Sequence, residues 1–232
     1  MLGGTGEVGE GITRALLSAG AIVAVVSRDN DKLSALHDRL PVEWDGQYVP
    51  IVGYLATPET AAAARHRVEF VCRRLDIVIA SLGGWWQKGP IVFSTIEDWN
   101  RVLATNLTTH YIAATAFLPV INKREGSSYV MISGAVADVP VPNSGLVSIS
   151  AHAQLMLARV LASEHRHEPV RVNTLIVGTP IVSRGKPEGE PDWLTAEEVG
   201  QYVTWLVSSR SRTRGQILRF NSRAQLVDLS WQ

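Results

Sequence analysis

Short apolar runs alternate with longer amphipathic stretches along the entire chain. The short runs are rich in Val, Ile and Leu and predict β-strands at residues 21–27, 48–53, 76–80, 128–133, 171–177 and 216–220. Because these runs are nearly continuous in apolar residues, we expect strands that are covered on both faces, as in a mostly parallel sheet.

The stretches between the runs have helical periodicity and predict helices at residues 10–19, 59–74, 95 to about 120, 147–165 and 195 to about 208. Thr95 with Asp98, and Thr195 with Glu198, have the spacing of capping boxes. The alternation predicts a single-domain α/β fold over residues 1–232, a Rossmann-like, doubly wound parallel sheet flanked by helices on both faces. The long irregular segment at 182–193 is interpreted as a lid over a ligand or as a mobile connection.

Composition narrows the class of function. The 22 Lys and Arg residues balance the 22 Asp and Glu residues, so neither nucleic acid nor an anionic membrane is expected as a partner. The single cysteine excludes a disulfide within the chain, and no metal site is predicted. We find no apolar run long enough to span a bilayer and no secretory signal, and therefore expect a cytoplasmic protein.

A glycine-rich turn opens the chain and leads into the first predicted helix. Such a turn lets backbone N–H groups approach a pyrophosphate, and the helix N-terminus favours its negative charge. A doubly wound sheet needs a strand before this turn, so we expect the first strand to lie upstream of Met1. The predicted pyrophosphate-binding residues are Gly3, Thr5, Gly6, Glu7, Val8 and Gly9.

The end of the next predicted strand indicates which dinucleotide is preferred. An acidic residue at this position accepts hydrogen bonds from the ribose of NAD, but here the strand ends in Ser27 and is followed by Arg28. A guanidinium suits a 2′-phosphate, so NADP(H) is favoured over NAD(H). The alternatives are a surface arginine at a strand end and a protein with no cofactor.

Several further segments, in their order and spacing, resemble the short-chain dehydrogenase/reductase family over essentially the whole chain. The opening turn resembles the family's TGxxxGxG loop, and the strand that ends in Leu82-Gly83 is similar to its NNAG strand. Arg171-Val172-Asn173 followed by Gly178-Thr179 resembles its RVN…PG segment. The resemblance implies that Leu82, Gly83, Gly178 and Thr179 contact the cofactor and that Asn106 is a catalytic residue.

The same resemblance exposes the main departure of this chain. The family uses a Ser, a Tyr and a Lys to orient the substrate and move its proton. The corresponding positions here are Gly134, Val147 and Ala151, none of which has a hydroxyl or ionisable side-chain group. Ser148 and His152 share a helix face and are an alternative acid/base pair, although an ordinary polar serine and histidine is the simpler interpretation.

Trp85 and Trp86 follow the Gly83-Gly84 turn at the carboxyl edge of a strand. With Gly134 and Val147 they are predicted to line an apolar substrate pocket; the alternative is packing under a loop or in a subunit contact. The resemblance therefore implies an NADP(H)-dependent oxidoreductase for a small apolar or aromatic carbonyl or alcohol. Two alternatives remain: a catalytically silent binding protein and a redox-neutral isomerase, dehydratase or cyclase. The family resemblance also implies a homo-oligomer, either a tetramer or a dimer.

Overall fold

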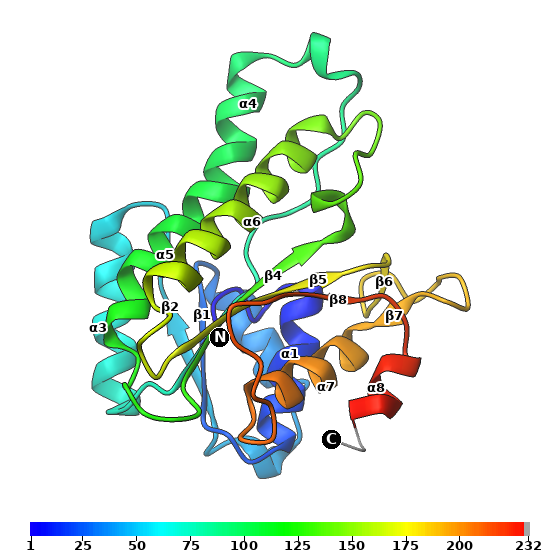
Figure 1. Ribbon diagram of the computed structural model, residues 1–232. Helices are drawn as coiled ribbons and strands as arrows, with labels where there is room; N and C mark the ends of the chain where they lie inside the picture. Colours follow the sequence, from blue (N-terminus) through cyan, green and yellow to red (C-terminus); the bar gives the residue numbers. More distant parts are fainter. Residues whose placement is uncertain (230–232) are drawn as a thin grey trace.

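The computed structural model describes residues 1–229 and shows an open parallel sheet with helices on both faces (Figure 1). Within this part of the chain, β2 pairs with β1, and β3, β4, β5 and β8 follow one another in a second set. All of these pairings are parallel, as the continuous apolar runs predicted. The strands are β1 (Val23–Ser27), β2 (Tyr48–Val52), β3 (Ile77–Ala80), β4 (Ser128–Gly134), β5 (Arg171–Val177) and β8 (Ile217–Phe220).

The opening residues join these two sets of strands. Leu2 forms parallel bridges to Val26 of β1 and to Ala80 of β3. Strand order therefore reverses at Leu2, because the chain proceeds outward through β1 and β2 on one side and through β3 on the other. In open α/β sheets, ligands bind beyond the carboxyl ends of the strands at such a reversal point.

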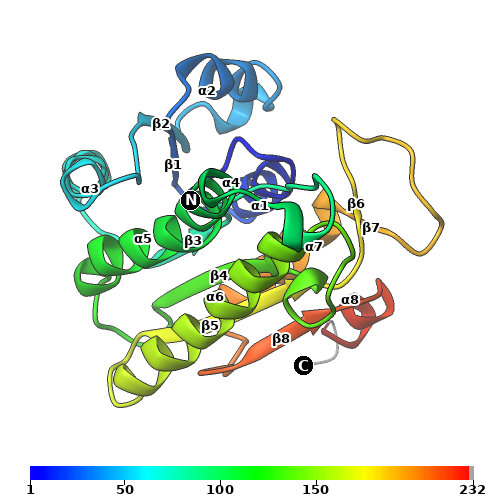
Figure 2. The ribbon, with the colours of Figure 1, turned by 90° about the horizontal axis from the view of Figure 1, so that it is seen from above.

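Helices cover both faces of the sheet, as Figures 1 and 2 show together. Three of the helices contribute residues to one apolar cluster, and three others contribute residues to a second apolar cluster. The first set is α1 (Glu7–Ser18), α2 (Asn30–His37) and α7 (Ala196–Val207), and the second is α3 (Pro58–Cys72), α5 (Thr109–Phe117) and α6 (Gly145–Glu164).

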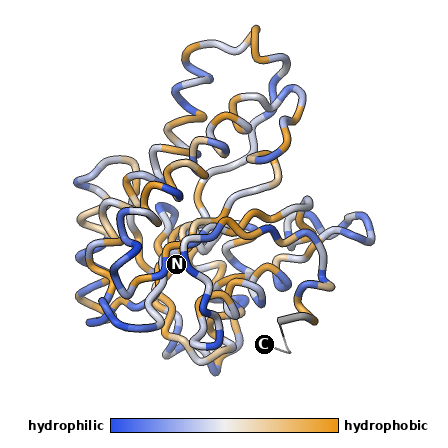
Figure 3. The backbone as a smooth tube through the Cα atoms, viewed as in Figure 1, coloured by the Kyte–Doolittle hydropathy of each residue, from blue (hydrophilic) through white to orange (hydrophobic). Residues whose placement is uncertain are grey.

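Alternate residues of each strand enter opposite clusters. Val23 and Val25 of β1 pack with α1 and α7, whereas Ala24 and Val26 pack with α3. Both sides of the strand therefore need apolar side chains, which explains the uninterrupted runs in the sequence. Figure 3 shows the resulting concentration of apolar residues along the sheet.

The predicted helix from 95 to about 120 is wrong in one respect, because it is not one regular helix. The chain forms α4 (Ile96–Leu103), then a π-helical turn at Ala104–Thr108, and then α5. Both predicted capping boxes are present, at Thr95 with Asp98 and at Thr195 with Glu198. The sequence pattern missed α2, whose N-cap Asp29 accepts a hydrogen bond from Lys32 N at 3.1 Å.

The predicted irregular segment at 182–193 differs from the structure by one residue. It lies between two short paired strands, β6 (Ile181–Val182) and β7 (Leu194–Thr195), and the loop is residues 183–193. A terminal helix, α8 (Ala224–Leu229), follows β8. By length and composition alone α6 could cross a membrane, contrary to the expectation that no run is long enough. The core helices of globular domains pass the same test, and Leu155 of α6 is buried.

Candidate dinucleotide and ligand site

The opening turn is shaped by contacts that only glycine permits. Gly3 has a φ of +77°, and a Cβ atom there would lie 2.1 Å from the carbonyl oxygen of Ser81. A Cβ atom on Gly9 would lie 2.1 Å from the carbonyl oxygen of Gly3. The turn therefore packs directly on the end of β3 and on the first turn of α1, leaving no room for side chains.

The start of α1 fits a bound anion. Gly6 is the N-cap residue, and no side chain caps the helix. The first N–H groups of a helix lack partners within the helix and attract negative charge. Gly6 is exposed, and a Cβ atom on it would have no contact closer than 3.4 Å. These residues suit the pyrophosphate of a dinucleotide.

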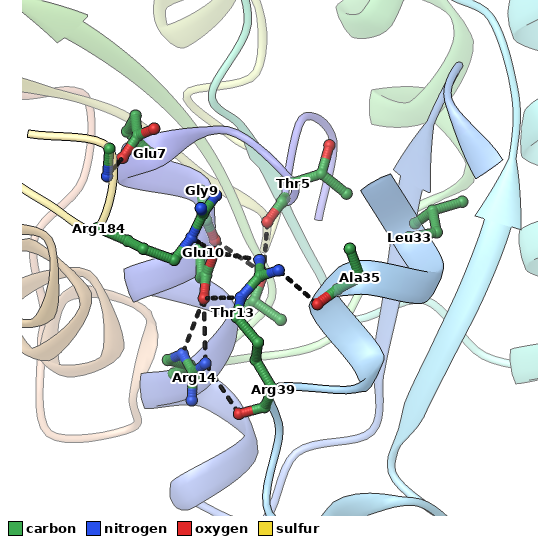
Figure 4. Close-up of polar contacts among 12 residues, drawn as sticks. Thr5, Glu7, Gly9, Glu10, Thr13, Arg14, Leu33, Ala35, Arg39 and Arg184 are labelled. Atoms are coloured by element: carbon green, nitrogen blue, oxygen red, sulfur yellow. Dashed lines mark hydrogen bonds and ion pairs between the residues drawn. The ribbon is translucent and has the colours of Figure 1, made fainter. Parts of the chain in front are cut away.

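Glu7, in the first turn of α1, turns toward the loop at 183–193. Its carboxylate accepts a hydrogen bond from the backbone N–H of Gly185 at 3.1 Å. Figure 4 shows this contact beside the start of α1. The side chain thus links the first turn of α1 to the loop and places a negative charge next to the predicted pyrophosphate site.

Glu10 is the centre of an arginine cluster that the sequence pattern did not reveal (Figure 4). Its carboxylate lies 2.7 Å from Arg39 Nη2, 3.0 Å from Arg14 Nη2 and 3.6 Å from Arg184 Nε. Burial raises the pKa of Glu10, but hydrogen bonds from Arg39 and Arg14 outweigh it and hold the pKa below its usual value. Glu7 and Glu10 therefore both attach the 183–193 loop to α1.

The predicted adenosine-side residues lie together at the end of β1. Ser27 Oγ is 3.1 Å from Thr5 Oγ1 and accepts a hydrogen bond from Asp29 N at 3.3 Å. Arg28 is exposed, and its guanidinium has no hydrogen bond or ion pair among the described residues. An exposed cation therefore directly follows Ser27, whose hydroxyl contacts the glycine turn at Thr5.

Asn106 lies in the π-helical turn and binds the backbone of the neighbouring segment. Its Oδ1 accepts a hydrogen bond from Gly84 N at 3.0 Å, and its Nδ2 donates one to Gly84 O at 2.9 Å. Gly83 has a φ of +102°, and a Cβ atom on it would come within 3.0 Å of Asn106 Oδ1. The amide group thus fixes the segment that carries Trp85 and Trp86.

His110, one turn beyond Asn106, is a buried group that the sequence did not single out. Its Nε2 lies 3.2 Å from the carbonyl oxygen of Leu82, to which it donates a hydrogen bond. Burial lowers the pKa of His110 to about 4. The imidazole is therefore neutral at physiological pH and supports the Leu82-Gly83 end of the strand.

The three positions predicted to correspond to Ser, Tyr and Lys carry no polar side chain. Gly134 ends β4, and Val147 and Ala151 are buried on α6. Val147 packs in a cluster with Trp86 and other apolar residues, and Ala151 packs with Leu155 and others. No phenol or ammonium group occupies these three positions.

Gly134 itself has space around it. A Cβ atom there would have one neighbour within 4 Å, a methyl group of Val136 at 3.9 Å. Trp86 packs against the cluster beside it, whereas Trp85 is 61% exposed. The structure therefore brings Gly134, Val147 and Trp86 to one region but leaves Trp85 outside the apolar cluster.

The alternative Ser148–His152 pair is not formed. Ser148 Oγ accepts a hydrogen bond from Val141 N at 3.4 Å, while His152 Nδ1 lies 2.9 Å from the carbonyl oxygen of Ala137. Each side chain binds a nearby backbone group, in agreement with the simpler interpretation. Across residues 1–229 there is also no group of three or more His, Cys, Asp or Glu side chains suited to a metal ion.

Gly178 and Thr179 support the base of the 183–193 loop. A Cβ atom on Gly178 would lie 2.0 Å from Asn221 Oδ1 and 3.1 Å from the carbonyl oxygen of Phe220, so Gly178 packs closely against the end of β8. Thr179 Oγ1 accepts a hydrogen bond from Leu194 N at 2.9 Å. Both residues thus lie just beyond the carboxyl end of β5, at the edge of the sheet where the opening turn also lies.

A doubly wound sheet with a glycine turn at its reversal point is the architecture of a dinucleotide-binding Rossmann domain. The sequence profile described as enoyl-(acyl carrier protein) reductase matches residues 5–221. The chain therefore belongs to the short-chain dehydrogenase/reductase family, which binds nicotinamide dinucleotides.

Individual relatives agree with this assignment. Dehydrogenase/reductase SDR family member 4 of Rattus norvegicus is 28% identical over 177 residues, which cover 75% of this chain and 62% of that protein. The chain thus spans less than two thirds of that relative's length.

Two solved structures share the fold. One is an apo short-chain oxidoreductase of Pseudomonas aeruginosa described as containing an atypical catalytic center, with 21% identity, 95% and 94% coverage and a TM-score of 0.85. The other is ElxO with NADP bound, which is 17% identical in sequence and has a TM-score of 0.81. The match covers 94% of this chain and 95% of that structure's chain.

Proposed function

We propose that this protein binds NADP(H) at the opening turn and holds a small apolar or aromatic carbonyl or alcohol beside it. The observation that carries the proposal is Arg28, an exposed cation without a hydrogen bond or ion pair among the described residues, which directly follows Ser27 at the end of β1. A 2′-phosphate there would gain charge-assisted hydrogen bonds, whereas the strand ends in Ser27 and not in the acidic residue that receives the ribose hydroxyls of NAD.

In this proposal each part of the turn has a separate task. Gly3, Gly6, Val8 and Gly9 let the pyrophosphate approach the backbone, and Leu82, Gly83, Gly178 and Thr179 border the rest of the dinucleotide. The cofactor supplies hydride chemistry when it is bound. The residues of the chain bind it and orient it, and Glu7 and Glu10 attach the 183–193 loop to α1.

In this proposal the ligand lies beside Gly134, Val147 and Trp86, with Trp85 at the rim. The open space at Gly134 and the apolar wall of Val147 and Trp86 suit a flat, weakly polar molecule. Asn106 acts here as a positioning residue, because both ends of its amide are engaged with Gly84.

An ordinary reaction of this family also needs a side chain that transfers a proton to or from the substrate oxygen. A family enzyme moves it through the phenol and ammonium groups, and the corresponding side chains here are those of Val147 and Ala151, both buried among apolar residues. This observation favours a second candidate function, a dinucleotide-binding protein that does not turn over its ligand. The two candidates share the binding site and differ only in turnover.

Turnover assays separate them. NADPH is incubated with a panel of aromatic aldehydes and ketones, and its near-ultraviolet absorbance is followed for the native protein and for a Gly134→Ser, Val147→Tyr, Ala151→Lys variant. We expect slow or no oxidation by the native protein and a gain of at least about 100-fold in the variant, the usual worth of general acid catalysis. Native turnover as fast as in ordinary family enzymes contradicts the loss of proton transfer.

We also propose a homo-oligomer, a dimer or a tetramer, formed through α4, α5 and α6. These helices carry large apolar residues on their outer surfaces, namely Trp99, Tyr111, Ile149, Met156 and Val160. Exposed apolar patches of this kind mark protein interfaces. Light scattering of the native protein and of a Met156→Glu variant tests the proposal, since the variant is expected to shift toward the monomer.

A further inference from the structure

A basic cavity lies at the edge of the sheet opposite the opening turn. Its volume is about 500 Å³, and the side chains that line it include those of Glu125, Arg171, Ser209, Ser211, Arg212 and Arg214. Arg171 is the first residue of β5, whereas Gly178 directly follows the carboxyl end of that strand. The seven residues of β5 therefore separate this cavity from the dinucleotide site by about 20 Å.

Arg171 places a buried positive charge in the wall of the cavity. The residue is 5% exposed, and its guanidinium donates to carbonyl oxygens, among them those of Val207 at 3.0 Å and Ser211 at 2.6 Å. Its Nε is buried without a hydrogen-bond partner. Buried charges are ordinarily paired with an opposite charge, but no carboxylate of residues 1–229 pairs with this guanidinium. Its charge is thus offset only by carbonyl dipoles.

Two further arginines, both from the segment that joins α7 to β8, line the same cavity. The guanidinium of Arg214 is held in place because it donates to the carbonyl oxygen of Pro169 at 3.0 Å. Arg212 forms an ion pair with Glu125 at 2.5 Å. Burial lowers the pKa of Arg171, and the positive charges of Arg214 and Arg212 lower it further. The three guanidinium groups therefore repel one another across the cavity.

The charges around the cavity do not balance. Among the described residues that line it, three guanidinium groups face a single carboxylate, that of Glu125, which leaves an excess of two positive charges. The side chains of Arg212 and Glu125 are 80% and 86% exposed, so water screens their ion pair. An excess of this size matches the charge of a phosphate group, which is close to a dianion at neutral pH.

We propose that this cavity binds a phosphate dianion, carried by a small ester or free in solution. Arg212 and Arg214 have N–H groups beyond those engaged in the structure, and the fork of an arginine matches the oxygens of a phosphate. Ser211 Oγ accepts a hydrogen bond from Thr213 N at 3.3 Å and can donate its own proton to the ligand. The buried charge of Arg171 stands behind these donors.

The size of the cavity favours an ester over the free ion. A volume of about 500 Å³ is in the range of small-molecule sites and leaves room for an organic group beside the phosphate. Because the cavity lies at the amino end of β5, the proposal does not depend on which dinucleotide binds at the opening turn.

Calorimetric titration with glycerol 2-phosphate, inorganic phosphate and acetate tests the class of ligand. The titrations are run in a chloride buffer of fixed ionic strength at about pH 8, where the phosphate groups are dianions. We expect both phosphate compounds to bind saturably, the ester more tightly, and acetate to bind at least about tenfold more weakly than the ester. Tighter binding of inorganic phosphate supports the site with the free ion as its ligand. Binding of neither phosphate compound, or equal binding of acetate, overturns the proposal.

Two substitutions locate the bound phosphate. Arg212→Ala removes an exposed guanidinium of the cavity and is expected to weaken phosphate binding at least about tenfold. Arg28→Ala is the matched control, because it removes an exposed arginine from the dinucleotide site, and its phosphate affinity is expected to stay within about twofold of the native value. Loss of binding in Arg28→Ala would place the phosphate at the opening turn. That result, or native affinity in Arg212→Ala, overturns the proposal.

Glu125→Gln gives a gain in affinity that partial unfolding cannot imitate. The Glu125 carboxylate is exposed and competes with the ligand for Arg212. Removing its charge is expected to tighten phosphate binding about two- to fivefold and to enlarge the rise in melting temperature that phosphate causes. Unchanged or weaker phosphate binding by this variant contradicts the proposed role of the cavity's charge.

Discussion

Replacing Asn106 with alanine tests how the ligand side of the site is held in place. The Asn106 amide forms two hydrogen bonds with Gly84, at 3.0 and 2.9 Å, and the side chain is buried. Asn106→Ala removes both bonds and frees the segment that carries Trp85 and Trp86.

The size of the effect follows from the same contacts. A buried hydrogen bond contributes about 1 kcal/mol net, so the loss of two costs about 2 kcal/mol of unfolding free energy. The penalty stays near this value because Gly84 is exposed and water can replace part of the lost bonding. For a domain of this size it corresponds to a decrease of about 4–8 °C in the melting temperature.

The measurement is thermal unfolding followed by circular dichroism. Asn100→Ala serves as a matched control, because Asn100 is exposed on α4 and its side chain forms no hydrogen bond with any residue of 1–229. We expect its melting temperature to stay within about 2 °C of the native value. Asn106→Ala melting together with this control would refute the positioning role of the amide.

Two further predictions concern charged and titrating groups. Glu7→Gly is expected to tighten NADPH binding about two- to fivefold in calorimetric titration, because it removes an exposed negative charge beside the pyrophosphate site. Glu7→Gln can still accept the hydrogen bond from Gly185 N and should give most of the same gain in affinity. Unchanged or weaker NADPH binding by both variants would contradict the electrostatic repulsion. His110 has its pKa lowered from 6.5 to about 4 in the fold, so the unfolded chain takes up its proton first as pH falls. The free energy of unfolding is therefore unaffected by His110 above pH 6.5, and protonation of this residue in the unfolded chain lowers it by about 3 kcal/mol as the pH falls to 4. Urea unfolding of His110→Gln should show a shallower decline over this interval, and an identical pH profile would refute the assignment.

The fold was largely predictable from the sequence because its main determinants are local. Each strand is a continuous apolar run, and capping boxes at Thr95 and Thr195 mark where two of the helices begin. Local rules failed where regular geometry is interrupted. The π-helical turn at Ala104–Thr108 leaves no mark in the hydrophobic pattern, and α2 is too short to show a clear period.

The site divides in the same way. The glycine turn can be identified in the sequence because it is a compact motif, and the sequence spacing predicts that Val147 stands at the tyrosine position. The Glu10–Arg39 ion pair joins residues 29 positions apart, and the Asn106–Gly84 bonds join residues 22 positions apart. Such contacts depend on how the elements pack, and no short pattern encodes them.

Comparing NADPH with NADH by calorimetric titration tests the central claim most directly, with Arg28→Ala measured beside the native protein. A guanidinium–phosphate contact contributes about 1.5–3 kcal/mol, so the native protein is expected to bind NADPH at least about tenfold more tightly than NADH. Arg28→Ala is expected to lose this preference while keeping its affinity for NADH. Equal native affinities for the two dinucleotides, or no binding of either, would contradict the account.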